Sequence, residues 1–92
     1  MTTLDGLGRA LQAYCLFGAS APNVDPHILI DFVRSGLSGI SGQTSRKDPI
    51  IGGIRLIGEL KIKEAKDTLQ IALNDNNTSV RNEAKEALKL IA

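Results

Sequence analysis

The residues of this chain that could carry nucleophilic chemistry are one cysteine, Cys15, and one histidine, His27. A thiolate activated by a neighbouring imidazole is a familiar nucleophile–base pair. Here Cys15 falls on the apolar stripe of one expected helix and His27 in the first turn of another, which favours a buried thiol and a surface imidazole. Zinc sites usually take three or four such ligands. The sequence therefore predicts no catalytic residues, no metal and no cofactor.

A glycine series at Gly36, Gly39 and Gly42 suggests a phosphate-binding loop. The P-loop needs a Gly-Lys-Ser/Thr step that opens a helix, but Gln43 follows Gly42. The dinucleotide fingerprint needs a preceding strand, and a helix is expected there instead. Residues 38–47, SGISGQTSRK, combine glycine and serine with no hydrophobic period, so they are predicted to form a mobile loop.

The acidic residues Glu83 and Glu86 could in principle form an acid–base pair. Lys85 lies near Glu83 in the sequence, and Lys89 follows Glu86 by three positions, within reach on one helix face. Ion pairs on a solvated helix surface are therefore the better interpretation.

Composition limits the class of protein. The chain has 92 residues, which is enough for one domain, residues 1–92, with no room for a second core. Only 3% of the residues are aromatic, so the core must be aliphatic, which favours packed helices. The net charge of +1 is too small for a nucleic-acid or membrane footprint.

No segment predicts export or membrane insertion. No stretch approaches the ~18 consecutive apolar residues of a membrane span, and the first residues lack the basic and apolar regions of a signal peptide. A single cysteine forms no internal disulfide. We expect a soluble cytoplasmic domain that does not contact a membrane.

Hydrophobic periodicity predicts an all-α fold of about five helices. Gly18 is expected to end the first helix, and the pairs Asp25-Pro26 and Asp48-Pro49 are typical helix starts, with Asp as N-cap and Pro at the first position. The expected helices cover approximately residues 4–17, 25–37, 49–60, 63–74 and 78–91.

The segment IIGGIRLIGEL is ambiguous because Gly52, Gly53 and Gly58 interrupt it. Each glycine costs roughly 1 kcal/mol relative to alanine in a helix, so a strand is the alternative. The Asp48-Pro49 start favours the helix.

Two shifts of the sequence indicate an internal repeat. Apolar or small residues recur 31 positions apart in one pair of expected helices and 36 apart in another. The first set superposes Gly53, Leu56, Ile57 and Leu60 on Ala84, Ala87, Leu88 and Ile91, and the second superposes Leu29, Val33, Gly36 and Leu37 on Ala65, Leu69, Ala72 and Leu73. Such self-similarity predicts a short α-solenoid of antiparallel helix pairs, in which the first two helices pair, the next two pair and the last is unpaired.

The last expected helix begins at Asn77, Thr78 or Ser79, each of which could serve as N-cap. Its residues follow an Asp, a short turn, Val-Arg and then Ala-x-x-Ala-Leu, matched by Asp75, Val80, Arg81, Ala84, Ala87 and Leu88. This pattern resembles the first helix of a HEAT-like repeat, in particular the short HEAT-like repeats of phycobilisome bilin lyases. The resemblance implies a structural ladder between Asp75 and Arg81.

The resemblance also implies where a partner binds, because the second helices of HEAT-like solenoids line a concave binding face. The candidate residues on these helices are Ile30, Arg34, Lys63, Lys66, Gln70 and Ile71. Ile30 and Ile71 are aliphatic at positions expected to face water, although contact with an adjacent helix is an equal alternative.

We therefore expect a non-catalytic protein–protein interaction or assembly module whose partner is a protein. The alternative implied by the resemblance is an accessory subunit of an enzyme similar to the bilin lyases, which would hold a chromophore-bearing protein. A nucleic-acid-binding HEAT-like solenoid is a third alternative, disfavoured by the low net charge.

The unpaired last helix suggests self-association. Its residues Ala87, Leu90 and Ile91 are expected to form a partly uncovered edge. A second copy related by a two-fold axis could cover that edge, so a homodimer or a hetero-complex is predicted there.

Overall fold

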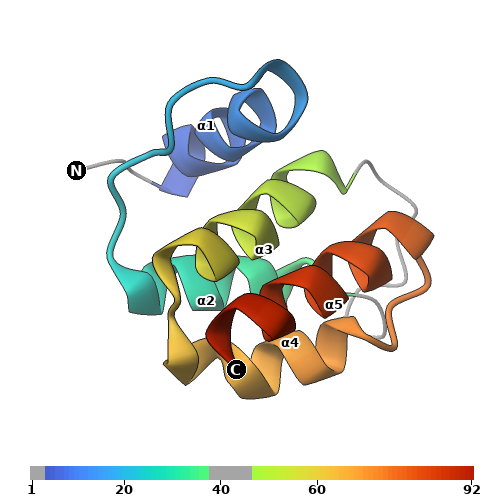
Figure 1. Ribbon diagram of the computed structural model, residues 1–92. Coiled ribbons are helices and arrows are strands. Elements are labelled where there is room, and N and C mark those ends of the chain that lie inside the picture. The colour runs from blue at the N-terminus through green and yellow to red at the C-terminus, as the bar shows by residue number, and fades with distance from the viewer. Residues whose placement is uncertain (1–3, 38–46) are drawn as a thin grey trace.

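The structure is a computed structural model that describes residues 4–37 and 47–92 (Figure 1). Within these residues it contains five α-helices, one 3-10 turn and no strand. They are α1 (Leu4–Phe17), α2 (Pro26–Ser35), α3 (Asp48–Leu60), the 3-10 turn η1 (Lys63–Ala65), α4 (Lys66–Ala72) and α5 (Thr78–Ile91). The prediction of an all-α fold with about five helices is confirmed, and the strand alternative for IIGGIRLIGEL is wrong.

Local capping signals define the ends of α1 and α2. Gly18 follows α1 with a φ of 67°, in the left-handed region where glycine is favoured. The Asp25 carboxylate accepts a hydrogen bond of 2.8 Å from the backbone N–H of His27, and Pro26 occupies the first turn. The end of α1 and the start of α2 are therefore as predicted.

At the starts of α3 and α5, the structure shows which of the other predicted N-cap residues is correct. Asn77 is the N-cap of α5, because its side chain accepts a hydrogen bond of 3.1 Å from the N–H of Val80. The expected Asp48 cap is wrong: Asp48 lies inside α3, and Lys47 occupies the N-cap position without a side-chain cap bond. A carboxylate in the first turn still interacts favourably with the helix dipole.

Helix α3 is the centre of the molecule. It packs against α1, α2 and α5, while α4 packs mainly on α5. Figure 1 shows α1 and α4 at opposite ends of the stack, with α3 and α5 between them. Because neighbours surround it, α3 buries residues on most sides, namely Ile50, Gly52, Gly53, Ile54, Leu56, Ile57 and Gly58.

The glycines of α3 permit these close contacts. A Cβ at Gly52 would overlap the backbone carbonyl oxygen of Leu11 in α1. A Cβ at Gly58 would lie 3.0 Å from the Cα of Ala87 in α5, which is tighter than nine in ten Cβ contacts in proteins. The glycines that cost helix propensity thus let two helix backbones approach α3, and tertiary packing overrides the local preference.

Residue pairs along the helices give their directions. Arg55 of α3 pairs with Glu83 of α5, and Gly58, further along α3, contacts Ala87, further along α5. The two helices therefore run parallel. The separations of 28 and 29 residues are close to the 31 expected from the repeat.

The helix pairs differ from the predicted ones. The antiparallel pairs are α2 with α3 and α4 with α5, and contacts between α1 and α2 or between α3 and α4 are slight. Helix α5 is therefore paired, and α1 is the additional helix. The predicted fourth helix, 63–74, is divided into η1 and α4.

The burial of superposed residues differs most at the last position of the first set. Leu60 of α3 is 54% exposed, whereas its equivalent Ile91 of α5 is only 6% exposed.

Four further large apolar residues are exposed: Leu16, Phe17, Ile71 and Leu90. In the described part of the chain, no helix has the length and apolar character needed to cross a membrane.

Candidate functional site

A groove lies between η1–α4 and the end of α5, and we call it the α4–α5 groove. Its volume is about 430 Å³. Lys63, Lys66 and Gln70 line one wall, and Leu88, Ile91 and Ala92 line the other. The antiparallel packing of α4 on α5 creates it by placing the start of one helix beside the end of the other.

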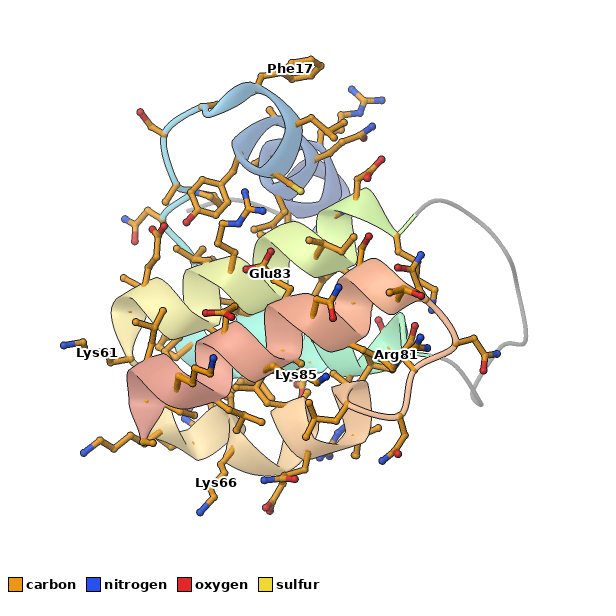
Figure 2. All side chains as sticks on the ribbon, turned by 45° about the vertical axis from the view of Figure 1, so that its right-hand side comes forward. Phe17, Lys61, Lys66, Arg81, Glu83 and Lys85 are labelled. Atoms are coloured by element: carbon orange, nitrogen blue, oxygen red, sulfur yellow. The ribbon has the colours of Figure 1, made fainter. Side chains whose placement is uncertain are left out.

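The α4 wall is polar and carries positive charge. Lys63, Lys66 and Gln70 are spaced three and four residues apart, which puts them on one helix flank. All three are exposed, and neither lysine forms an ion pair with a described residue. Figure 2 shows Lys66 extending from α4 away from the helix stack.

The α5 wall is apolar. Leu88 is half-buried and Ile91 is 6% exposed. The groove thus has an aliphatic side and a cationic rim, a combination suited to binding a segment that is both apolar and acidic. Sequence reasoning singled out Lys63, Lys66, Gln70 and Ile91, but it missed Leu88 as a groove residue because it had no basis for packing the start of α4 against the end of α5.

The other three candidate partner residues do not line this groove. Ile71 follows Gln70 directly, so it points about 100° away around α4, and it is 44% exposed. Ile30 is half-buried and packs against the core, and Arg34 is exposed on α2. The six candidate residues therefore do not all line the α4–α5 groove, and Ile30 follows the alternative in which it touches neighbouring helices.

The predicted uncovered edge of α5 is also wrong for two of its residues. Ala87 is 1% exposed and Ile91 is 6% exposed, because α3 and α4 cover them. Leu90 is 50% exposed and lies over Gly58 of α3. Self-association through α5 stays a prediction that rests on Leu90 alone.

Arg81 interacts with Asp75, as expected, but it bonds to the backbone of Asp75 and not to its carboxylate. The Nη1 of Arg81 donates a hydrogen bond of 2.6 Å to the backbone carbonyl oxygen of Asp75, and Nη2 donates one of 3.0 Å to the Thr78 hydroxyl. The guanidinium thereby ties the turn before α5 to the first turn of that helix (Figure 2).

We expect Arg81→Ala to lower the free energy of unfolding by roughly 1–3 kcal/mol, since two charge-assisted hydrogen bonds are lost. Lys85→Ala, on the exposed surface of the same helix, should change it by less than about 0.5 kcal/mol. Chemical denaturation with circular dichroism measures both. Equal effects at the two positions would show that Arg81 is an ordinary solvated charge.

The carboxylate of Asp75 binds a partner that the sequence did not suggest. The ammonium of Lys47 lies 3.3 Å from Asp75 Oδ1 and donates a hydrogen bond of 2.8 Å to the backbone carbonyl oxygen of Gly36. Both side chains are largely buried, with 10% and 0% exposure. Lys47 therefore connects the end of α2, the start of α3 and the turn between α4 and α5.

This interaction corrects the predicted loop 38–47 at its last residue, because Lys47 is held in place. Residues 38–46 lie outside the described part of the chain, and so do Gly39 and Gly42 of the glycine series. Gly36 is the C-cap of α2, where its N–H bonds to carbonyl groups of the preceding turn.

A second groove, of about 390 Å³, lies between α1, α3 and α5. Its lining includes Cys15, Arg55 and Glu83. Arg55 donates a hydrogen bond of 3.0 Å to Glu83, and this bond raises the pKa of the guanidinium. Burial raises the pKa of Cys15, so its thiol is protonated at neutral pH and is a weak nucleophile.

The predicted surface ion pairs are partly correct. Lys89 lies 3.5 Å from Glu86, as expected. Glu83 pairs with Arg55 of α3 rather than with Lys85 of its own helix. His27 is exposed and is not among the residues that line the Cys15 groove. The described residues contain no cluster of potential metal ligands.

Fold and grooves together define an all-α protein whose α4–α5 groove has one apolar and one cationic wall. Comparison with protein families, with curated proteins and with solved structures finds no match for this chain. The similarity to HEAT-like repeats is thus a hypothesis based on the residues of the last helix and on the internal repeat.

Proposed function

We propose that this chain is a non-catalytic, cytoplasmic protein-interaction module built from HEAT-like helical hairpins, and that it binds a partner protein through the α4–α5 groove. The observation that carries the proposal is the meeting of Lys63, Lys66 and Gln70 with Leu88 and Ile91 around one groove. Three of these residues are exposed polar groups, and half-buried Leu88 offers most of the apolar contact area beside the nearly buried Ile91.

The parallel course of α3 and α5 supports the HEAT-like part of the proposal. Stacked repeats place equivalent helices side by side in the same direction. The equivalent pairs Leu29/Ala65 and Val33/Leu69 are buried in both copies. Repeats of this kind use their helical surfaces to bind other macromolecules.

Affinity capture of interacting proteins, followed by mass spectrometry, tests the proposal. The bait is the full chain, compared with a groove variant, Lys63→Glu/Gln70→Ala, and a control variant, Arg9→Glu/Gln12→Ala, that makes matched changes on α1. We expect a partner that the wild type and the control retain and the groove variant loses. A partner set that is the same for all three baits would contradict binding through the groove.

The identity of the captured partner distinguishes the alternatives. A chromophore-bearing protein of the phycobilisome would favour the accessory subunit of an enzyme. Nucleic acid that co-purifies in a nuclease-sensitive manner would favour the third alternative. A partner unrelated to either would favour a general assembly role.

A further inference from the structure

We infer that the occupant of the α4–α5 groove is an acidic amphipathic helix, whose apolar side chains contact Leu88 and Ile91 and whose carboxylates face Lys63 and Lys66. This inference rests on the proposed function and names the chemistry of the partner. It follows from the charge of the rim, the chemistry of the opposite wall and the backbone of the two helices.

The charge of the rim comes first. Lys63 and Lys66 line the groove, and none of the described residues that line it with them has an acidic side chain. Neither lysine forms an ion pair with a described residue. Glu86 and Glu83 of α5, by contrast, are already paired with Lys89 and Arg55. The two lysines can therefore receive carboxylates from a partner without breaking an existing ion pair.

The opposite wall accounts for the apolar part of the occupant. Leu88 is half-buried against the core and is one of the residues that line the groove. A volume of about 430 Å³ accommodates a few aliphatic side chains. Burial of such side chains against Leu88 and Ile91 removes apolar surface from water, which favours association.

The helical form of the occupant follows from hydrogen bonding. Both walls are helical, with η1 and α4 on one side and α5 on the other, and neither wall contains a strand. An extended peptide would find no sheet edge with which to pair its backbone. A helix satisfies its own backbone and can lay an apolar stripe into a groove between two helices.

Nucleic acid is the other anionic candidate, and the rim does not favour it. Two lysines neutralise few phosphates, and the net charge of the chain is only +1. Among the residues that the structure describes, the lining includes no aromatic side chain on which a base could stack.

The test uses three fluorescein-labelled helical peptides with leucine at positions i, i+3, i+4 and i+7. They carry glutamate, glutamine or lysine at the flanking positions and are otherwise identical. We expect the glutamate peptide to bind roughly tenfold more tightly than the glutamine peptide, the ratio for two exposed charge pairs. Fluorescence anisotropy measures Kd, and amide chemical shifts of the labelled protein should change at residues 63–70 and 88–92.

The charge-reversed variant Lys63→Glu/Lys66→Glu provides the sharpest comparison. It should lose affinity for the glutamate peptide and gain affinity for the lysine peptide. Arg9→Glu/Arg34→Glu makes the same change of net charge away from the groove and should leave the order of the three peptides unchanged. Thermal unfolding followed by circular dichroism establishes that each variant is folded.

Three outcomes would overturn the inference: equal binding of the glutamate and glutamine peptides, no binding at millimolar concentration, or tighter binding of a single-stranded oligonucleotide than of any peptide. A captured partner that requires the groove yet contacts it with a neutral or basic segment would overturn the acidic helix while supporting the proposed function. A partner set that ignores the groove variants would instead contradict the proposed function itself.

Discussion

Gly52→Ala should destabilise the protein by about 2 kcal/mol, although alanine is the better helix former by up to ~1 kcal/mol. The added Cβ would overlap the carbonyl oxygen of Leu11 and approach the Leu11 carbonyl carbon to 3.1 Å. Both atoms belong to backbone, so α1 has to shift as a whole instead of one side chain changing rotamer. Forced overpacking of this kind costs typically ~1–3 kcal/mol and occasionally more.

Thermal unfolding monitored by circular dichroism measures this effect. For a domain of this size, about 2 kcal/mol lowers Tm by roughly 8–16 °C. Gly8→Ala is the matched control, because Gly8 lies in helix α1 and its added Cβ would meet only Phe32, at an ordinary 3.7 Å. That substitution should raise Tm slightly. A decrease of similar size at both positions would show that the close approach of α1 to α3 does not decide the result.

Lys47→Met should also have a large effect, lowering the free energy of unfolding by about 2–4 kcal/mol. The Asp75 side chain is 0% exposed, and the Lys47 ammonium 3.3 Å away balances its charge. Removal of one partner from a buried pair typically costs ~3–5 kcal/mol. We expect somewhat less, because Asp75 keeps the hydrogen bond of 3.0 Å from the backbone N–H of Asn77.

A double variant separates the charge from the packing. Lys47→Met/Asp75→Asn removes both charges, so part of the stability lost in the single variant should return. Lys89→Met, which breaks the exposed pair with Glu86, should change the stability by less than about 1 kcal/mol. Denaturant titration measures these variants together with the single variant Asp75→Asn, which completes the double-mutant cycle. Simple additivity of Lys47→Met and Asp75→Asn would mean that the two side chains are energetically independent.

The helices of this chain follow from short-range patterns. Gly18, the Asp25-Pro26 pair and Asn77 act on backbone groups within a few residues, so their effects are readable from neighbouring positions. The same holds for the apolar stripe of α5, where Val80, Ala84, Ala87 and Ile91 are all buried. These signals need no knowledge of which helix lies opposite.

The role of the α3 glycines depended on tertiary structure. In the sequence, Gly52 and Gly58 count only as losses of helix propensity. In the folded chain, they are the positions where Leu11 of α1 and Ala87 of α5 come closest to α3. The compensating energy comes from packing between helices, which a local pattern does not contain.

The same long-range packing between helices determines the buried ion pair and the α4–α5 groove. Lys47 and Asp75 are 28 residues apart and meet only because α3 begins beside the turn that precedes α5. Lys63 and Lys66 acquire an apolar wall opposite them only because α4 packs antiparallel on α5, which brings Leu88 and Ile91 alongside. Sequence periodicity specifies which side of each helix is apolar, but several pairings bury those sides equally well, and close packing of the whole chain selects among them.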